Sequence, residues 1–363
     1  MPTDYAGRPG IIARVLNVNT LARPLLRWAN RSGERIGRPF DPATPVGPPS
    51  GRHSWTHYGV MVPGLPEPHR TFGVMSIVGT PGVSIFANDH AITTTPNDTA
   101  YLVSATAAMR GGTFRAYSIA GDCEFAADGS RLRFGDDLEI SGRYPGLEVR
   151  RSHPDADVSL RLRATDKVTW FADVRGDLYS HWSLLCEYDG TVGGAGVSGL
   201  CTFEYARGAG LHSLPVPGTP NVPATFFSYH VLNVDDRTQV LFGEARLPGG
   251  IPVIRAAWVR GLDDYGTEYT DASLAIRRHE AGPRETPDGR RMRLPSELAV
   301  TARDADGGEV FTLEGKTNGD WAYGLGAGFV GSYAYDGTFR GRNVSGTAYM
   351  EYVDLAGDSG TGG

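Results

Sequence analysis

The strongest constraint on the fold of this chain is an internal repeat. Three short motifs recur at a fixed offset of 147 residues: Tyr188-Asp189-Gly190-Thr191 returns as Tyr335-Asp336-Gly337-Thr338, Val197-Ser198-Gly199 as Val344-Ser345-Gly346, and Glu204-Tyr205 as Glu351-Tyr352. Three matches at one offset indicate a duplicated unit. We predict that each copy is a hairpin that closes one domain. Its first strand ends at the tyrosine, the Asp-Gly pair turns the chain, and the Val-Ser-Gly strand returns with a glycine that permits close strand contact.

The residues between the repeats favour short antiparallel strands. Residues 158–163 and 298–303 alternate apolar and polar side chains, which is typical of a half-buried strand. Asp-Gly pairs at 128–129, 288–289 and 306–307 are suited to tight hairpins. The 49 glycines and 24 prolines are scattered between apolar runs, as turn residues are. The sequence therefore predicts an all-β protein with two tandem antiparallel barrels.

The length of 363 residues is comfortable for two domains. We predict an N-terminal helix and extended connector (1–50), a first barrel (51–205), a Pro- and Gly-rich linker (206–223), a second barrel (224–355) and a flexible tail (356–363). Apolar residues between Ile11 and Trp28 recur at roughly helical spacing. This short helix either packs across the mouth of a barrel or lies on a membrane surface; packing is favoured because its polar face is not rich in Lys and Arg.

Charge and cysteine usage exclude several classes of function. A net charge of −6 argues against a nucleic-acid partner. Three widely spaced cysteines fit neither a disulfide framework nor a zinc site. No apolar run approaches the ~20 residues of a transmembrane helix, and no secretory signal opens the chain, so we predict a cytoplasmic protein. His53 and His57 could share one face of a strand, but without a third ligand nearby in sequence we predict no metal site and no cofactor.

The closing hairpins also carry a resemblance. Ser180-His181-Trp182-Ser183, Gly199–Tyr205 and the doubled Val-x-Gly hairpin resemble the AttH / hydroxyneurosporene synthase (carotenoid 1,2-hydratase) superfamily, and more closely an actinobacterial branch of mostly unassigned function. The resemblance implies two tandem lipocalin-like domains and a hydrophobic ligand. The superfamily includes hydratases of isoprenoid double bonds, and related folds act as pericyclases. An aspartate of the hydratases corresponds to Glu204, but their Asp-Arg-Glu-Trp run is replaced by Tyr205, Ala206 and Arg207.

Glu204 is the leading catalytic candidate. By strand parity its side chain lies on one face of the strand, and Phe203 and Tyr205 lie on the other face. If its face points into the barrel, the apolar surroundings would raise its pKa, and the neutral acid could protonate an alkene or polarise a carbonyl. Alternatively, Glu204 is a structural acid at the domain junction. Glu351 at the equivalent place in the second domain strengthens that alternative.

Aromatic and histidine side chains supply the candidate ligand-binding residues, which are Trp170, His181, Trp182, Tyr229, His230 and Trp258. The aromatics could hold a flat or polyene ligand or stabilise a cation, and either histidine could exchange a proton near neutral pH. Taken singly, each of them more often fills the core. As a group they make an apolar binding cavity plausible.

These features predict a cofactor-independent cyclase, isomerase or hydratase, with a pericyclase role included. It would shape a hydrophobic terpenoid or polyketide and use Glu204 as the acid. One alternative is a non-catalytic carrier of a lipid or other hydrophobic molecule, which would have an almost purely apolar lining. Another is an interaction scaffold with filled barrels. The sequence does not indicate an oligomeric state.

Overall fold

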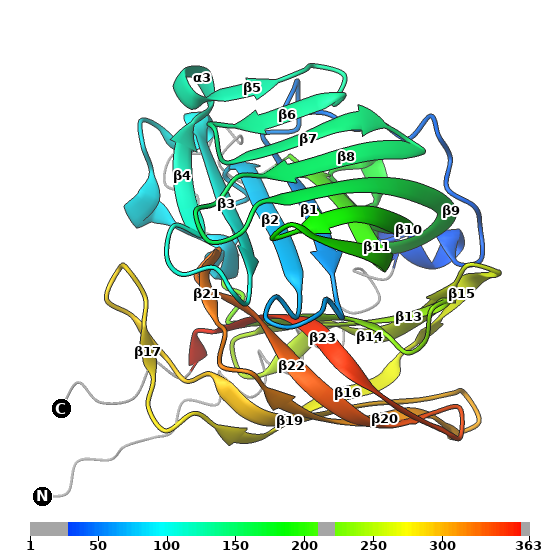
Figure 1. Ribbon diagram of the computed structural model, residues 1–363. Coiled ribbons are helices and arrows are strands. Elements are labelled where there is room, and N and C mark those ends of the chain that lie inside the picture. Colours follow the sequence, from blue (N-terminus) through cyan, green and yellow to red (C-terminus); the bar gives the residue numbers. More distant parts are fainter. Residues whose placement is uncertain (1–27, 210–221, 357–363) are drawn as a thin grey trace, which may run out of the picture.

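A computed structural model describes residues 28–209 and 222–356 of the chain. It contains an 11-stranded and a 10-stranded antiparallel sheet, each strongly curled, and the first lies above the second in Figure 1. The helices in the described parts are single turns. The predicted all-β class with two tandem lipocalin-like barrels is confirmed. The predicted N-terminal helix, most of the linker and nearly all of the tail lie outside the described residues.

The first sheet has the strand order β4-β3-β2-β1-β11-β10-β9-β8-β7-β6-β5. Its strands are β1 Trp55–Val62, β2 Phe72–Gly79, β3 Thr99–Thr106, β4 Phe114–Ser118, β5 Cys123–Phe125, β6 Arg131–Phe134, β7 Leu138–Arg143, β8 Gly146–Arg151, β9 Val158–Val174, β10 Tyr179–Val192 and β11 Ala195–Gly208. The short helix α3 (Ile119–Asp122) joins the two edge strands, which curls the sheet toward a barrel. Single 3₁₀ turns are Ser32–Arg35, Ser84–Phe86, Asp89–Ala91, Pro96–Asp98 and Arg175–Asp177.

The second sheet repeats this arrangement with the order β15-β14-β13-β12-β23-β22-β20-β19-β16. Its strands are β12 Phe226–Asn233, β13 Thr238–Leu247, β14 Ile251–Gly261, β15 Asp264–Tyr269, β16 Asp271–His279, β19 Pro295–Arg303, β20 Glu309–Thr317, β22 Gly328–Phe339 and β23 Arg342–Asp354, with β21 Ala322–Leu325 paired to β22. A small ribbon of β17 (Arg284–Glu285) and β18 (Arg291–Met292) stands apart. In both sheets the first strand of the domain pairs with its last strand, which brings β1 beside β11 and β12 beside β23.

The repeat forms the predicted closing hairpins, but the turns lie elsewhere. Gly190 and Gly337 lie within β10 and β22, and the chain turns later, at Gly193-Gly194 and at Arg340-Gly341, where all four residues have positive φ. The Asp-Gly turn prediction is therefore wrong for these two pairs. A Cβ on Gly190 would lie 2.0 Å from a backbone oxygen of the neighbouring strand, so the glycine serves close strand approach.

At the other repeated glycine the close contact is with a side chain and not with the neighbouring strand. Gly199 lies directly opposite Tyr188, and Gly346 lies directly opposite Tyr335. In each hairpin the tyrosine ring covers the glycine, and a Cβ at Gly346 would lie 2.8 Å from the tyrosine oxygen. The duplicated motif is thus a tyrosine packed over a glycine across two strands.

Two cores follow from strand parity. On β1, Tyr58 and Val60 pack inside the first barrel, while Met61 points the other way and joins the core of the second domain. The same alternation holds on β2 and β3, whose outward residues Met75 and Tyr101 also pack against the second domain. The outward-facing side chains of β1, β2 and β3 therefore form part of the interface with the second domain.

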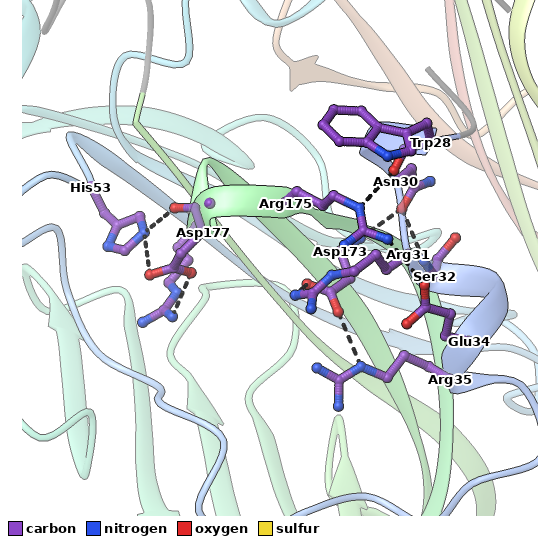
Figure 2. Close-up of polar contacts among 12 residues, drawn as sticks. Trp28, Asn30, Arg31, Ser32, Glu34, Arg35, His53, Asp173, Arg175 and Asp177 are labelled. Atoms are coloured by element: carbon purple, nitrogen blue, oxygen red, sulfur yellow. Dashed lines mark hydrogen bonds and ion pairs between the residues drawn. The ribbon is translucent and has the colours of Figure 1, made fainter. Parts of the chain in front are cut away.

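The segment before β1 is tied along β9. Arg31 and Arg35 both reach the carboxylate of Asp173, at 3.2 and 3.0 Å (Figure 2). Asn30 forms an antiparallel β-bridge with Val174. Further on, the backbone N–H of Phe40 donates to the carbonyl of Asp166 at 2.8 Å.

None of the helices in the described ranges is long and apolar enough to cross a membrane.

Candidate active site

Glu204 lies between the two sheets. Phe203 and Tyr205 point into the first barrel, and Glu204 points the other way, as strand parity predicts. Its face does not line the barrel; it meets the second domain. There the hydroxyl of Tyr229 on β12 donates to Glu204 Oε1 at 2.5 Å. Both side chains are buried, so this is a charge-assisted hydrogen bond shielded from water.

His181 on β10 faces the other carboxylate oxygen. Its Nε2 lies 3.8 Å from Glu204 Oε2, too far for a hydrogen bond, and this buried nitrogen has no hydrogen-bond partner among the described residues. Its Nδ1 lies 3.1 Å from the hydroxyl of Tyr179. The His181 side chain is 22% exposed, so it forms the solvent-facing edge of an otherwise buried cluster.

His57 on β1 completes the cluster. Its Nδ1–H donates to the carbonyl of Ser76 at 2.8 Å, because a carbonyl can only accept, and this leaves Nε2 as an acceptor in the neutral ring. Burial and the neighbouring His181 lower the pKa of His57 to about 4, so the ring is neutral near pH 7. Gly59 lies between His57 and Glu204, and a Cβ there would come within 3.1 Å of Nε2 and 3.2 Å of Glu204 Cβ. The missing side chain leaves room at this point.

The raised pKa expected for Glu204 is not found. Burial acts to raise the pKa of its carboxyl, but the adjacent His181 and the hydrogen bond from Tyr229 outweigh burial and hold the pKa below its ordinary value. Glu204 is therefore a carboxylate at neutral pH. The physical reason is its position: the interface supplies polar partners that the interior of a barrel would lack.

Glu351, its equivalent in the repeat, is in the opposite state. It lies on β23 directly opposite Tyr229 and accepts a hydrogen bond from Tyr349 at 3.0 Å. Burial and the nearby charge of Glu204 raise its pKa to about 8. The site thus holds one ionised and one protonated carboxyl group, with Tyr229 adjoining both.

Arg260 on β14 connects the two domains beside this cluster. The fully buried guanidinium donates to the carbonyl of Ser183 at 2.6 Å, to Ser183 Oγ at 3.0 Å and to Gln239 Oε1 at 2.8 Å. Ser183 lies directly opposite Glu204 on the neighbouring strand. A buried cation at this place stabilises the Glu204 carboxylate through space and fixes the second sheet against the first.

The structure brings four of the seven predicted site residues together. These four are Glu204, His181, Tyr229 and Trp258. The centre of the Phe171 ring lies 4.8 to 5.6 Å from the ring centres of the last three and so links them. These rings give the cluster an apolar wall. The predicted carboxylate, one predicted histidine and two of the four predicted aromatic residues therefore lie in one cluster at the domain interface.

The other three predicted residues lie elsewhere. Trp182 points into the first barrel, and Trp170 lies under the guanidinium of Arg35 at 4.9 Å. His230 is buried inside the second barrel between Ser228 and Tyr333, and burial lowers its pKa to about 3, which indicates a neutral core histidine. Strand parity separates Trp182 from His181 and His230 from Tyr229, because adjacent residues face opposite sides of a sheet.

Sequence reasoning did not place His57, Phe171, Tyr179, Tyr349 and Arg260 in the site. Parity was a usable signal for Tyr179, since it shares a strand face with His181. It gave no signal for Phe171, whose neighbour Trp170 is expected on the opposite face of the strand. His57 was considered only with His53, whose Nε2 instead faces Asp177 at 3.3 Å (Figure 2). Nothing in the sequence indicates that Arg260 reaches across to the first domain.

The same cluster offers the atoms that a metal site needs. The ligand atoms of His57, His181 and Glu204 all lie within 4.8 Å of one another, and each histidine is oriented through its Nδ1. Three such atoms could hold a divalent cation after small side-chain movements. The pair His53 and His57 weighed from sequence is not the relevant one.

Comparison with known proteins agrees with this fold. The tandem pair of curled sheets and the polar interface between them define a tandem lipocalin-like protein. Residues 75–361 match the model of a family of unknown function (DUF6670), and the chain belongs to that family. The fold expected from the resemblance to AttH-like proteins is confirmed.

Two solved structures share the fold. A Nitrosomonas europaea protein assigned as AttH is 13% identical with a TM-score of 0.54, over 88% of this chain and 99% of that one. Kievitone hydratase from Nectria haematococca is 12% identical with a TM-score of 0.51, over 90% of this chain and 95% of that one. Identities this low show the fold alone. No curated protein sequence matches the chain.

Proposed function

We propose that this protein is an enzyme that hydrates, isomerises or cyclises a hydrophobic metabolite by acid–base chemistry between its two sheets. The carrying observation is the arrangement at Glu204. One carboxylate oxygen accepts from Tyr229, and the other faces the buried, unpartnered Nε2 of His181, whose ring is partly exposed. A buried group left without a partner among the described residues is unfavourable for folding and is typical of a site that completes its contacts with substrate.

Glu204 and Glu351 have different roles in the proposed reaction. Glu204 is ionised and suited to take a proton, while Glu351 is protonated near neutral pH and suited to give one. In a hydration, Glu204 removes a proton from water as the oxygen bonds to one alkene carbon, and Glu351 delivers a proton to the other carbon. In an isomerisation the same pair removes and returns a proton on carbon. Tyr229 holds Glu204 in place for either step.

The surroundings favour an apolar substrate. Phe171, Trp258 and Met61 pack around the polar groups, and the sheets contribute further apolar side chains from both domains. A terpenoid or polyketide with a double bond fits this chemistry. Kievitone hydratase, which shares the fold, supports hydration as one of the reactions that such a scaffold can host.

The test is label incorporation from solvent. The full-length chain is incubated with a panel of unsaturated terpenoids and polyketides in D₂O or in ¹⁸O-labelled water, and products are analysed by mass spectrometry. We expect one compound class to gain deuterium on carbon or ¹⁸O, and Glu204→Gln to slow this about 10²- to 10⁴-fold. The matched control is Glu187→Gln, which should keep the full rate. Glu187 lies on the same β10–β11 hairpin as Glu204, and its exposed carboxylate pairs with Arg163 on β9.

Two outcomes would overturn the proposal. A Glu204→Gln variant that incorporates label at the wild-type rate would remove the acid–base role. Tight binding of several panel members with no incorporation would identify a carrier. Treatment with EDTA followed by dialysis should leave the rate unchanged, since the chemistry needs only the side chains; a loss restored by a divalent cation would favour the metal-holding arrangement.

A further inference from the structure

The cluster of His57, His181 and Glu204 also has the form of a metal site. All three side chains project from the first sheet, on the neighbouring strands β1, β10 and β11. His57 and His181 both lie opposite Ala206 in the register, one on each side of β11, and Glu204 lies two residues away on the same face. The backbone of one sheet therefore holds the three groups in a triangle.

Small residues let the two histidine rings approach each other. Two strands that flank a third lie about 9 to 10 Å apart. The ring centres of His57 and His181 are nevertheless only 5.6 Å apart, at 82° to each other, so the rings lean together over β11. The β11 residue between them is Ala206, and the β1 residue beside Glu204 is Gly59. A Cβ on Gly59 would come within 3.1 Å of His57 Nε2, so a larger residue there would close the space.

The hydrogen bonds around the cluster leave one ligand atom of each group directed at the others. His57 Nδ1–H donates to a backbone carbonyl of β2 at 2.8 Å, and His181 Nδ1 lies 3.1 Å from the Tyr179 hydroxyl. Tyr229 donates to Glu204 Oε1, which leaves Oε2 facing His181 Nε2 at 3.8 Å. Partners of this kind behind the ligands are usual in metal sites, because they orient each ligand atom toward the ion.

The distances in the cluster are close to those of a zinc site. The three ligand atoms lie within 4.8 Å of one another. The ligand atoms of a tetrahedral zinc ion are roughly 3.4 Å apart, so each atom here would move by about 1 Å or less. The His181 side chain, which is 22% exposed, can make this movement and opens the cluster to an ion from solvent.

The chemistry of the ligands selects the class of ion. Two imidazoles with one carboxylate favour zinc and similar transition metals, whereas Mg²⁺ and Ca²⁺ prefer oxygen ligands throughout. Glu204 supplies a negative charge for the ion. The neighbouring cation Arg260 does not occupy its Oε2 atom, because the guanidinium donates to Ser183 and Gln239 instead.

We propose that His57, His181 and Glu204 bind one zinc-like divalent ion, with water as its fourth ligand, and that this ion inhibits the protein. Only the inhibition rests on the proposed function: the bound ion takes the lone pair with which the Glu204 carboxylate would accept a proton. The binding depends on the three side chains alone.

Isothermal titration calorimetry on the full chain, treated with EDTA and dialysed, measures the binding. We expect one equivalent of zinc chloride to bind with a Kd of about 10 µM or tighter, and magnesium chloride to bind at least about 100-fold more weakly. Cobalt chloride should give the visible absorption of a four-coordinate cobalt(II) ion.

Three variants locate the bound zinc. His181→Asn and Glu204→Gln should each weaken its binding at least about tenfold, and circular dichroism with thermal unfolding verifies their folds. The matched control is His53→Asn, which alters a histidine that pairs with Asp177 outside the cluster and should leave the affinity within twofold.

Inhibition is measured in the label-incorporation assay. Zinc chloride at ten times its Kd should lower turnover at least fivefold, and excess EDTA should restore it. The proposal is wrong if zinc does not bind at one equivalent, if His53→Asn weakens binding as much as His181→Asn, or if bound zinc leaves turnover unchanged or raises it. Failure of the proposed function has a different signature, since no compound then gains label with or without zinc, while calorimetry still decides whether the three side chains bind the ion.

Discussion

The two copies of the closing hairpin place the same acid in contrasting surroundings. Glu204 and Glu351 are equivalent in sequence, both are buried at the domain interface, and each lies on the last strand of its sheet. Yet the pKa of Glu204 is lowered and that of Glu351 is raised to about 8. The duplication fixed where the acids lie, and their neighbours decided which one carries charge.

The neighbours differ at three equivalent positions. The residue opposite the acid is Gly59 in the first domain and Tyr229 in the second. The positions of His57 and His181 are taken in the second domain by Phe227 and Gly328. The first domain therefore surrounds its acid with imidazoles, whereas the second supplies the tyrosine that bonds across the interface. A duplicated fold became one asymmetric site through substitutions on the flanking strands.

The largest effect is expected when the first acid is given the surroundings of the second. The double variant His57→Phe, His181→Gly should raise the pKa of Glu204 above its ordinary value, since burial is then unopposed by the imidazoles. Turnover in the label-incorporation assay should fall about 10³-fold. Carboxyl ¹³C NMR of labelled glutamate would follow the pKa. A double variant within threefold of the wild-type rate would show that the imidazoles do not set the state of Glu204.

A second prediction concerns stability as a function of pH. The pKa of Glu351 is raised in the folded protein from 4.5 to about 8. The contribution of the protonated Glu351 to the free energy of unfolding is therefore complete below pH 4.5 and is lost as the pH rises to about 8. Glu351→Gln should thus gain stability relative to the wild type across this window, by at most roughly 4 to 5 kcal/mol.

Urea unfolding at pH 5 and pH 8 measures this difference. Glu204→Gln is the comparison: its depressed pKa contributes stability above pH 4.5 that is lost on acidification, so this variant should be less stable than the wild type at pH 8. A Glu351→Gln profile parallel to the wild type would contradict the assigned protonation states.

A third prediction concerns a glycine that both closing hairpins contain. Gly190→Ala and Gly337→Ala should each lower the free energy of unfolding by about 2 to 3 kcal/mol, since in both a Cβ would lie 2.0 Å from a backbone oxygen of the adjacent strand. Thermal and urea unfolding provide the measurement. Gly196→Ala, where nothing lies within 4 Å, is the control and should change stability by under about 0.5 kcal/mol. Unequal effects in the two copies would mean that the hairpins are not structurally equivalent.

The smallest effect is expected from single tyrosine hydroxyls. Tyr229→Phe removes the donor to Glu204, so turnover should fall about tenfold, a loss of about 1.4 kcal/mol that is typical of one hydrogen bond to a charged group. Tyr349→Phe removes the donor to the protonated Glu351 and should change turnover less than twofold. Equal losses would place both acids in the same role.

Much of the fold was predictable because it rests on local patterns. Alternating apolar residues gave the strands, and the fixed offset gave the two equivalent domains. The turn positions were not predictable in the same way. Gly190 resembles a turn residue in sequence, but the contact that requires it comes from Ser159 on another strand. Trp182 was likewise expected near His181, whereas the pleat places them on opposite sides of the sheet.

By itself, the sequence determined that two antiparallel sheets form, that each ends with a buried acid, and on which strand face Glu204 lies. Only the tertiary structure decided that this face meets the second domain, where Tyr229, His57 and His181 converge from three other strands. The physical reason is that parity is a local property of the backbone, whereas the pKa of a buried acid depends on groups brought to it by distant parts of the chain.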